Sequence, residues 1–371
     1  MLSVVVPTHG RVDLLENLLK SLQRAIARCN VAVEVIIVDD SSKEEREKIE
    51  QLCQVFGATY FSGTSNVREK RNLGVRNSKG KIIFFVDSDC EVTPDIFNVH
   101  LQMYDKPDTG GVLGITEFTG KETYTWRIVK RTRFLDAFSF ARTLLTYVDS
   151  APWGTCTNLS IKKEILEEVG GFDTKFPFLL GGDDTDLGIR INKAGYKIRM
   201  NPHAIVIHTR ETWSNFVSVA KRAFRWGRMD YYVHFQKHKE KLSLTFVKPV
   251  TVLFPLMFIS VVKAVTDSSL IALFLPLAWL AVFLFVKSVS NIVLSNADSL
   301  MSLCFEMPAQ FLNFLFDLGT VLESIRSRNL AAFFKEPLCD PRQVIVLRTD
   351  KVREMWSLII SLLFLMILLV I

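Results

Sequence analysis

The stretch KIIFFVDSDCE, residues 81–91, decides the fold predicted for the first half of this chain. The apolar run between Gly80 and Asp87 is typical of a strand buried on both faces, as in a parallel sheet. Acids then follow at alternate positions, at Asp87, Asp89 and Glu91. Clustered carboxylates repel one another unless a cation lies among them, and α/β proteins bind ligands at the carboxyl ends of their strands. We therefore predict a divalent-metal site here, with a solvated loop as the alternative.

Strand-like runs alternate with segments of helical periodicity up to this point in the chain. The strand-like runs are LSVVVP (2–7), VAVEVIIVDD (31–40), ATYFS (58–62) and KIIFFVDSD (81–89). Before the second helical segment, Ser42 and Glu45 have the spacing of a capping box. The alternation predicts an α/β head domain with a Rossmann-like, mostly parallel sheet. Neither a GxGxxG after the first strand nor a GxxxxGK[ST] occurs, so the dinucleotide fingerprint and the P-loop are absent.

The composition changes along the 371 residues, of which 49% are hydrophobic. Residues 1–243 are mixed and charged, whereas much of 244–371 is nearly continuous Leu, Phe, Val and Ile. We predict a catalytic head over 1–210, an interfacial helix and linker over 211–243, and an α-helical membrane domain over 244–371. The sequence opens on a strand, so we expect no signal peptide, and the six scattered cysteines indicate a reducing compartment.

Three segments of the C-terminal part are apolar enough for membrane helices, at 245–265, 268–287 and, more briefly, 355–371. The helix at 300–322 differs, because polar residues recur every three or four positions along it. If it spanned, the basic loop at 326–353 would lie outside, against the positive-inside tendency. We predict a multi-pass cell-membrane protein with a cytoplasmic head, in which 300–322 lies on the cytoplasmic surface or packs under the head. The modest net charge of +6 suits membrane lipids or phosphates, not nucleic acid.

Six motifs occur in the order typical of family 2 glycosyltransferases of the GT-A fold. They are VVVPTHGR, VDDSS, REKRNLG, VDSD, GGF and GGDDTDLGIR. The chain resembles that family over residues 2–230, and the ordered set is highly specific. The resemblance implies a metal-dependent enzyme that takes a sugar from a nucleotide-sugar donor, with Mg²⁺ or Mn²⁺ as cofactor.

In the family, the first strand and the VDD acids hold the nucleoside of the donor. The matching residues in this sequence are Pro7, His9, Arg11, Asp39 and Asp40. A carboxylate can accept hydrogen bonds from a base N–H, which is the role that the resemblance implies for Asp40. The alternative for Asp40 is to cap the following helix.

Two arginines in NVREKRNLG, Arg68 and Arg71, are expected to face the phosphates of the donor. An anion is stabilised near a helix N-terminus, and guanidinium groups add charge-assisted hydrogen bonds. The alternative for both is a solvated helix surface.

VDSD resembles the DxD motif, and Asp87 and Asp89 share one side of an extended segment. Carboxylate oxygens suit Mg²⁺ or Mn²⁺, which balances the charge of a diphosphate. Asp89 is the expected direct ligand, whereas Asp87 is expected to contact the ribose, or the metal through water. The third ligand is expected to be Glu91 or His208, the latter in AIVIHTR, and a buried structural role is the alternative for His208.

GGDDTDLGIR resembles the acidic motif written GEDxDL in relatives. The matching general base is Asp184, with Asp183 in place of the usual Glu. A sugar hydroxyl is hardly ionised near neutral pH, so its attack needs a base. A solvated acidic loop is the alternative. Asp186 is expected to orient the loop or bind the acceptor, and Asn158 to line the sugar site.

The segment before the membrane part, WSNFVSVAKRAFRWGRMDYY, carries an apolar stripe beside cations and predicts an interfacial helix. RAFRW within it resembles the QxxRW motif of processive synthases, whose Trp stacks on an acceptor sugar. Arg225 and Trp226 are therefore candidate substrate-binding residues, although Arg222 replaces the Gln. The alternative is a helix that only docks on lipid headgroups.

The predicted function is inverting transfer of a sugar to a hydroxyl of a lipid-linked or glycan acceptor at the cytoplasmic membrane face. A polyprenyl-phosphate sugar synthase is an alternative whose acceptor is already ionised, and a processive polysaccharide synthase normally has more spans. A nucleotidyltransferase would show a GxGTR-type loop, which PTHGR does not provide. A non-catalytic scaffold would have no reason to keep acids at three sheet-edge positions.

Overall fold

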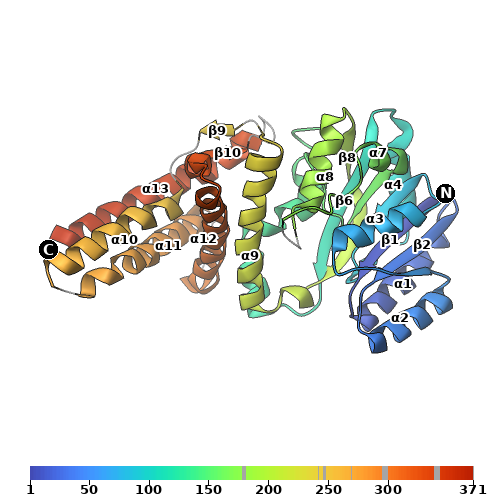
Figure 1. The fold of residues 1–371 in the computed structure, drawn as a ribbon, viewed down its shortest axis with the longest axis horizontal. Helices are drawn as coiled ribbons and strands as arrows, with labels where there is room; N and C mark the ends of the chain where they lie inside the picture. Colours follow the sequence, from blue (N-terminus) through green and yellow to red (C-terminus); the bar gives the residue numbers. More distant parts are fainter. Residues whose placement is uncertain are drawn as a thin grey trace. The chain divides into compact units, whose positions relative to one another are not determined.

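The chain folds into two compact units, seen in a computed structural model (Figure 1). The structure describes residues 1–177, 181–240, 242–244, 248–268, 270–294, 300–337 and 343–370. Unit 1 contains residues 1–121 and 136–212, and unit 2 contains residues 122–135 and 213–371. The predicted boundary near residue 210 lies close to this division, but no pattern in the sequence indicated that 122–135 packs with the C-terminal helices.

The core of unit 1 is an eight-stranded sheet, counted over the described residues. Across the sheet, the strands are β3 (Thr59–Ser62), β2 (Val33–Asp39), β1 (Leu2–Thr8), β4 (Ile82–Phe85), β7 (Leu159–Lys162), β6 (Thr109–Thr119), β8 (Lys197–Thr209) and β5 (Cys90–Val92). The neighbours among β1 to β4 are parallel, and so are β6 and β8. In contrast, β7 is antiparallel to β4 and β6, and β5 to β8. The predicted mostly parallel sheet therefore holds for β1 to β4, and the whole sheet is mixed because strand–helix alternation stops after β4.

Helices cover both faces of this sheet, because successive residues of a strand point to opposite sides. The helices of unit 1 are α1 (Val12–Ile26), α2 (Lys43–Phe56), α3 (Val67–Asn77), α4 (Ile96–Leu101), η1 (Gln102–Asp105), α6 (Phe140–Thr143), α7 (Lys163–Glu168) and α8 (Asp183–Lys193). Phe84 of β4 lies in one core with side chains of α1, α2 and α4. Ile83 and Phe85 lie in a second core with side chains of α3, α7 and α8. The predicted strand buried on both faces is confirmed over Ile82–Phe85, and the strand ends before the acids.

Unit 2 is mainly helical in its described residues (Figure 1). Its elements are α5 (Tyr124–Val129), α9 (Phe216–Tyr231), the π-helix η4 (Tyr232–Lys237), β9 (Leu242–Leu244), α10 (Pro249–Thr266), η5 (Leu270–Phe274), α11 (Leu275–Leu294), η6 (Leu300–Ser302), α12 (Leu303–Arg326), η7 (Leu330–Phe333), β10 (Lys335–Pro337) and α13 (Gln343–Val370). Two 3₁₀ segments, η2 (Arg133–Ser139) and η3 (Glu211–Trp213), lie where the chain passes between the units. The helices α10 to α13 share a core that contains the stacked rings of Trp279 and Phe283.

Helices α9 and α12 cross at close range through two glycines. A Cβ atom on Gly227 would lie 1.8 Å from the Phe316 carbonyl oxygen, and one on Gly319 would lie 2.2 Å from the Phe224 carbonyl oxygen. The Thr320 hydroxyl donates to the Gly227 carbonyl at 3.0 Å. Small residues allow two helix backbones to approach this closely. The helix predicted at 300–322 is thus packed on α9 within unit 2.

The polar stripe of α12 binds partners inside unit 2. Arg133 donates to Asp317 at 2.7 Å, and Gln310 and Asn291 each donate to Glu306 at 2.8 Å. Because Arg133 belongs to the 122–135 segment, this ion pair joins that segment to the C-terminal helices. The period of polar residues that made 300–322 look unlike a membrane span therefore reflects contacts with neighbouring elements.

Gly227→Leu is expected to destabilise unit 2, because the new side chain would have to push α12 away. Overpacking costs roughly 1–3 kcal/mol in ordinary cores, and contact with rigid backbone places this change near the upper end. Val217→Leu is the control, since Val217 lies on the same helix and is 58% exposed. Thermal unfolding in detergent should show a loss of several degrees for Gly227→Leu alone. Equal unfolding temperatures in the two variants would contradict the close crossing.

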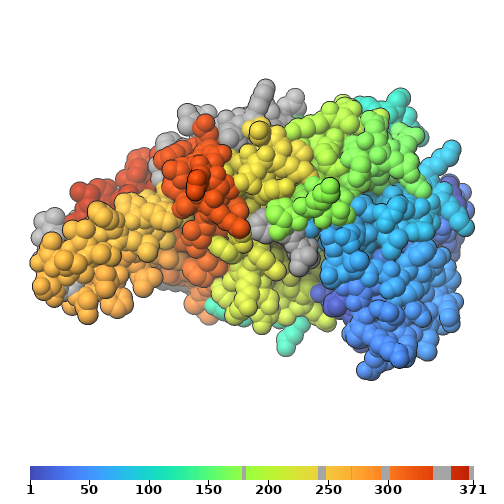
Figure 2. All heavy atoms as spheres, viewed as in Figure 1, coloured from blue at the N-terminus to red at the C-terminus, as the bar shows by residue number. Residues whose placement is uncertain are grey.

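Two described helical segments are long and apolar enough to cross a membrane, Pro249–Thr266 and Leu270–Val293. They expose large apolar side chains such as Phe258 and Val265 of α10. The helices from α10 onward form the yellow-orange to red part of the surface in Figure 2. The spans predicted at 245–265 and 268–287 fall on these segments apart from their first residues. Of those, 245–247 and 269 lie outside the described part of the chain, and 248 and 268 flank the helices. The third predicted span, 355–371, falls on α13 up to residue 370.

Candidate active site

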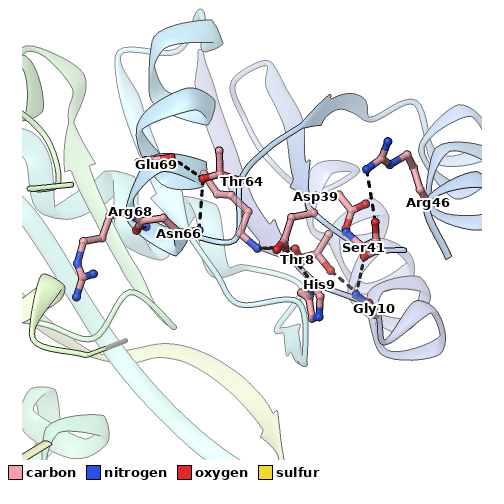
Figure 3. A network of polar contacts seen from close by, with 12 residues as sticks. Thr8, His9, Gly10, Asp39, Ser41, Arg46, Thr64, Asn66, Arg68 and Glu69 are labelled. Carbon is pink, nitrogen blue, oxygen red and sulfur yellow. Dashed lines mark hydrogen bonds and ion pairs between the residues drawn. The ribbon is translucent and has the colours of Figure 1, made fainter. Parts of the chain in front are cut away.

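The candidate site lies at the carboxyl ends of β1, β2 and β4, which parallel pairing brings to one edge of the sheet (Figure 3). Thr8, at the end of β1, is paired with Asp39, at the end of β2. The chain then turns through Gly10 and Arg11, both with left-handed backbone at φ 61° and 57°. A non-glycine residue in this region is strained, and such strain is common at functional sites.

Asp39 is fully buried and holds the loop that follows β2. Its carboxylate accepts hydrogen bonds from the backbone N–H of Ser41 at 3.1 Å, from the Ser41 hydroxyl, and from the Tyr60 hydroxyl at 3.3 Å. Ser41 Oγ in turn accepts from the Gly10 N–H at 2.6 Å, which ties the two loops together (Figure 3). The predicted substrate contact of Asp39 is corrected, since its burial and hydrogen bonds assign it to the loop. Pro7 is also buried, within β1, and its predicted ligand contact stays a prediction.

Asp40 pairs with Lys70, a residue that the sequence analysis missed. Lys70 Nζ lies 2.5 Å from Asp40 Oδ1 and donates to the Thr8 carbonyl at 2.7 Å. His9 Nδ1 lies 3.3 Å from the same Asp40 oxygen, and the His9 side chain is exposed. The N-cap of α2 is Ser42, which accepts from the Glu45 N–H as the capping-box spacing predicts. The capping alternative for Asp40 is therefore wrong. Asp40 and the exposed His9 instead lie side by side where β1 and β2 end.

Asp89 is buried and uses its two oxygens differently. Oδ2 accepts from Arg11 at 2.7 Å, whereas Oδ1 lies 3.4 Å from His208 Nε2 and 4.0 Å from Cys90 Sγ. His208 Nδ1 lies 2.6 Å from the Thr209 carbonyl oxygen. Because a carbonyl oxygen cannot donate, Nδ1 carries a proton, and in the neutral imidazole Nε2 is left as a lone pair. A carboxylate oxygen and an imidazole lone pair then face each other.

Asp89 and His208 fit a divalent cation. Ligand distances of about 2.0–2.2 Å around one ion place neighbouring ligand atoms roughly 3.0–3.5 Å apart, which the 3.4 Å between Oδ1 and Nε2 satisfies. The Nδ1–H bond to the backbone is the second interaction that orients a metal-binding histidine. The arrangement supports the predicted pair, and it adds Cys90, because ligand atoms of all three residues lie within 4.8 Å of one another.

The other two predicted metal ligands lie elsewhere. Glu91 points to the face of β5 opposite Cys90, where its carboxylate lies 3.7 Å from Arg24 on the surface. Its prediction as a ligand is corrected, because a one-residue step along a strand reverses the side chain. Asp87 accepts from Arg71 at 3.1 Å and from the Thr157 hydroxyl at 3.0 Å. Asp87 is therefore beside the cluster rather than within it.

Arg71 links the end of β4 to the start of α8. One nitrogen of its guanidinium donates to Asp183, and another donates to Asp87. Arg68 is almost fully buried, donates to the Gly181 carbonyl at 2.8 Å and stacks over the Phe176 ring at 4.6 Å. Both expectations for Arg68, a phosphate ligand or a solvated surface, are corrected, because it anchors the loop ahead of α8.

Asp184 stands in the first turn of α8, next to the buried Asp183. Burial, and the charge of Asp183, raise the pKa of Asp184 to about 7, while Arg71 opposes the shift. A carboxylate that titrates near neutral pH is poised to accept a proton from a hydroxyl. Asp186 is fully buried and accepts from Arg190 at 2.8 Å within α8, and its expected role of orienting the loop or binding the acceptor stays a prediction.

Asn158 is fully buried, and its side chain binds other core residues. Its amide donates to the carbonyls of Ile115 and Ala204 at 2.8 and 2.9 Å, and its Oδ1 lies 2.9 Å from His100 Nε2. The expectation that it lines the sugar site is corrected, because these bonds tie β6 to β8 inside the core.

The two candidate residues of RAFRW belong to unit 2. Trp226 packs against Phe134 and Trp213, with ring centroids 5.6 and 6.0 Å away, and Arg222 stacks over Trp213 at 4.5 Å. The buried face of α9 carries Val219, Ala223 and Gly227. Arg225 is exposed.

Comparisons with known proteins agree with this geometry. Residues 3–170 match glycosyl transferase family 2, and residues 146–212 match the N-terminal domain of galactosyltransferase. The probable glycosyltransferase YdaM of Bacillus subtilis is 25% identical over 254 residues, which cover 62% of this chain and 55% of that protein. The uncharacterised glycosyltransferase YfnE of the same organism is 24% identical over 267 residues, which cover 58% of this chain and 66% of that protein. The chain thus spans between about half and two thirds of the length of these curated relatives.

Among solved structures, the mannosyltransferase PcManGT of Pyrobaculum calidifontis, in complex with GDP-Man and Mn²⁺, has the same fold. Its TM-score is 0.51 at 17% sequence identity, and the match covers 88% of each chain. Fold, family match and relatives agree. Residues 3–170 thus match the model of glycosyl transferase family 2, and the head has a GT-A-like fold that it shares with PcManGT.

Proposed function

We propose that the chain is a membrane-bound inverting glycosyltransferase that moves a sugar from a nucleotide-sugar donor to a hydroxyl of a lipid-linked or glycan acceptor. The observation that carries this proposal is the carboxylate of Asp184, whose pKa is raised to about 7. It is joined to the strand ends through Asp183, Arg71 and Asp87. A hydroxyl acceptor needs a base of this kind, because its own proton is not lost near neutral pH.

Asp89 and His208 would hold Mg²⁺ or Mn²⁺ at the strand ends. When bound, the cation would offset the negative charge that develops on the leaving diphosphate. PcManGT, which has the same fold, was solved with GDP-Man and Mn²⁺, and this supports a nucleotide-sugar donor and a divalent cation for the chain. Asp40 and His9 would contact the nucleoside, since they lie next to each other just after the ends of β2 and β1.

The chain's own groups would carry the proton transfer. Asp184, ionised, would accept the hydroxyl proton while the acceptor oxygen attacks the anomeric carbon. The bond from that carbon to the diphosphate breaks on the opposite side, so one displacement inverts the configuration. Arg71 would fix the distance between the start of α8, which carries Asp184, and the end of β4, because it binds Asp183 and Asp87 at the same time.

Membrane attachment rests on unit 2. Two helical segments have the length and apolar composition of spans, and α10 and α13 expose apolar side chains such as Phe258 and Phe364. Exposed apolar surface of this extent is typical of a lipid-facing region. We place the head in the cytoplasm, the third span at 355–371, and the acceptor at the cytoplasmic membrane face. The roles of Arg225 and Trp226 toward the acceptor stay a prediction.

Transfer itself tests the proposal. The full chain, reconstituted in lipid, would be incubated with Mn²⁺, a panel of radiolabelled nucleotide sugars and a membrane lipid extract. One donor is expected to yield a labelled product whose anomeric configuration is inverted. Absence of transfer from every donor, or a product of retained configuration, would overturn the proposal.

Asp40→Ala is expected to raise the donor KM by roughly ten- to a hundredfold, because a hydrogen bond to a charged group contributes roughly 1.5–3 kcal/mol. The dependence of transfer on Mn²⁺ concentration should not change. Glu44→Ala is the matched control, since Glu44 is an exposed carboxylate on the neighbouring helix that pairs only at 3.4 Å with Lys48. A donor KM that is the same in both variants would restrict Asp40 to its pairing with Lys70.

A further inference from the structure

A thiol belongs to the cluster at the strand ends, and the proposed function does not use it. Cys90 and His208 are directly paired across β5 and β8, so their side chains share one face of the sheet. Cys90 Sγ lies 4.0 Å from Asp89 Oδ1, and ligand atoms of the three residues lie within 4.8 Å of one another. Among the described residues, these three are the His, Cys, Asp or Glu side chains that lie close enough together to hold one metal ion.

The spacing of the three ligand atoms is close to that of a tetrahedral zinc site. Zinc binds carboxylate oxygen and imidazole nitrogen at about 2.0–2.1 Å and thiolate sulfur at about 2.3 Å. Tetrahedral angles then place oxygen and nitrogen about 3.3 Å apart and oxygen and sulfur about 3.5 Å apart. The observed separations are 3.4 Å between oxygen and nitrogen and 4.0 Å between oxygen and sulfur, and all three atoms lie within 4.8 Å of one another. Cys90 Sγ therefore has to move toward the other two atoms when the ion binds.

The donor set also selects the kind of cation. A thiolate favours Zn²⁺ and other late divalent cations, whereas Mg²⁺ and Mn²⁺ favour oxygen. Arg11 donates a hydrogen bond to Asp89 Oδ2, so Oδ1 is the oxygen that faces His208 and Cys90. Three protein ligands leave the fourth tetrahedral position open, as in zinc sites that keep an exchangeable ligand.

We propose that Asp89, Cys90 and His208 form a site for Zn²⁺ in which the Cys90 thiolate is a ligand. The sulfur–zinc bond forms as the thiol proton passes to solvent. Because the proposed Mn²⁺ site uses Asp89 and His208 as well, Zn²⁺ would exclude Mn²⁺ and stop transfer. That consequence rests on the proposed function, whereas the thiolate ligation does not.

Cobalt provides the test, because Co²⁺ replaces Zn²⁺ and its bond to a thiolate gives a charge-transfer absorption in the near ultraviolet. The full chain in detergent, first stripped with EDTA, would be titrated with Co²⁺. We expect the band to grow up to one equivalent and to disappear when Zn²⁺ is added. Cys90→Ser should lose the band. Cys53→Ser is the matched control and should keep it, since Cys53 is equally buried, at 2% exposure, in the same core.

A Co²⁺ spectrum without this band, or a band that persists in Cys90→Ser, would overturn the proposal and leave Cys90 as a core residue. His208→Ala gives a second variant with the thiol intact, and it should weaken Co²⁺ binding at least tenfold. Unchanged affinity in that variant would also overturn the proposal. The absorption band reports thiolate ligation without any sugar donor, so it can be observed even if the chain transfers no sugar. Sugar transfer with Mn²⁺ can likewise be observed even if Cys90 does not bind a cation.

Discussion

Asp89→Ala is expected to abolish measurable sugar transfer, a loss of at least about 10²-fold. The variant removes the carboxylate that faces His208 and leaves Arg11 without its acceptor. Nucleotide binding should weaken only when Mn²⁺ is present, because the lost group binds the cation rather than the nucleotide. Titration of a nucleoside diphosphate with Mn²⁺ and with EDTA would measure both effects.

Glu91→Ala is the matched control for this experiment. Glu91 lies two residues further along the chain and carries the same type of side chain, but it lies on the face of β5 opposite Cys90 and pairs with Arg24. Transfer by Glu91→Ala should remain near that of the unchanged chain. An active Asp89→Ala enzyme, or an equal loss in both variants, would contradict the assignment of the metal site.

Asp184→Asn is expected to lower kcat by about 10² to 10⁴, the usual contribution of a general base. The substitution keeps the size of the side chain and removes its basicity, so donor and metal affinity should stay near those of the unchanged chain. Since the pKa of Asp184 is about 7, kcat/KM of the unchanged chain should rise with pH through that value, and this step should vanish in the variant. A loss of only several-fold would point to an acceptor that is already ionised, such as a polyprenyl phosphate.

The same substitution should stabilise the fold at alkaline pH. The pKa of Asp184 is raised in the folded state, so folding favours the protonated form, and ionisation costs stability as pH rises from about 4 to about 7. Asparagine cannot ionise, so the variant should gain thermal stability over this range and hold the full gain above pH 7. A stable but inactive variant would separate the catalytic loss from any unfolding.

Local patterns predicted the head domain well. Apolar alternation and runs gave β1 to β4, and the spacing of Ser42 and Glu45 gave the N-terminus of α2. The predicted parallel pairing places the ends of these strands at one edge of the sheet, and the register of β1 with β2 and β4 confirms the pairing. These features depend on neighbours in sequence or on a single topological rule.

The contacts that define the site could not be predicted in this way. Arg71 and Asp183 are 112 residues apart, and Lys70 and Asp40 are 30 apart. Nothing in the local sequence separates an arginine that faces a ligand from one, such as Arg68, that anchors a loop from within the core. The position of Glu91 was equally hard to predict, because the direction of its side chain depends on the residue at which β5 begins.

The C-terminal unit shows which sequence signals have more than one physical cause. A polar stripe on an apolar helix indicates either a membrane surface or a packed neighbour. In α12 the stripe meets α9 and Arg133, a residue about 180 positions earlier in the chain. The glycines that permit the crossing, Gly227 and Gly319, carried no pattern of their own.

Binding of nucleoside diphosphates to the full chain, measured by titration calorimetry with Mn²⁺ and again with EDTA, tests whether the strand ends form a metal-dependent donor site. We expect that at least one nucleoside diphosphate binds, that Mn²⁺ tightens its binding at least tenfold, and that Asp89→Ala removes this gain. Failure of every nucleoside diphosphate to bind, or equal affinity with Mn²⁺ and EDTA, would show that the strand ends do not form such a site.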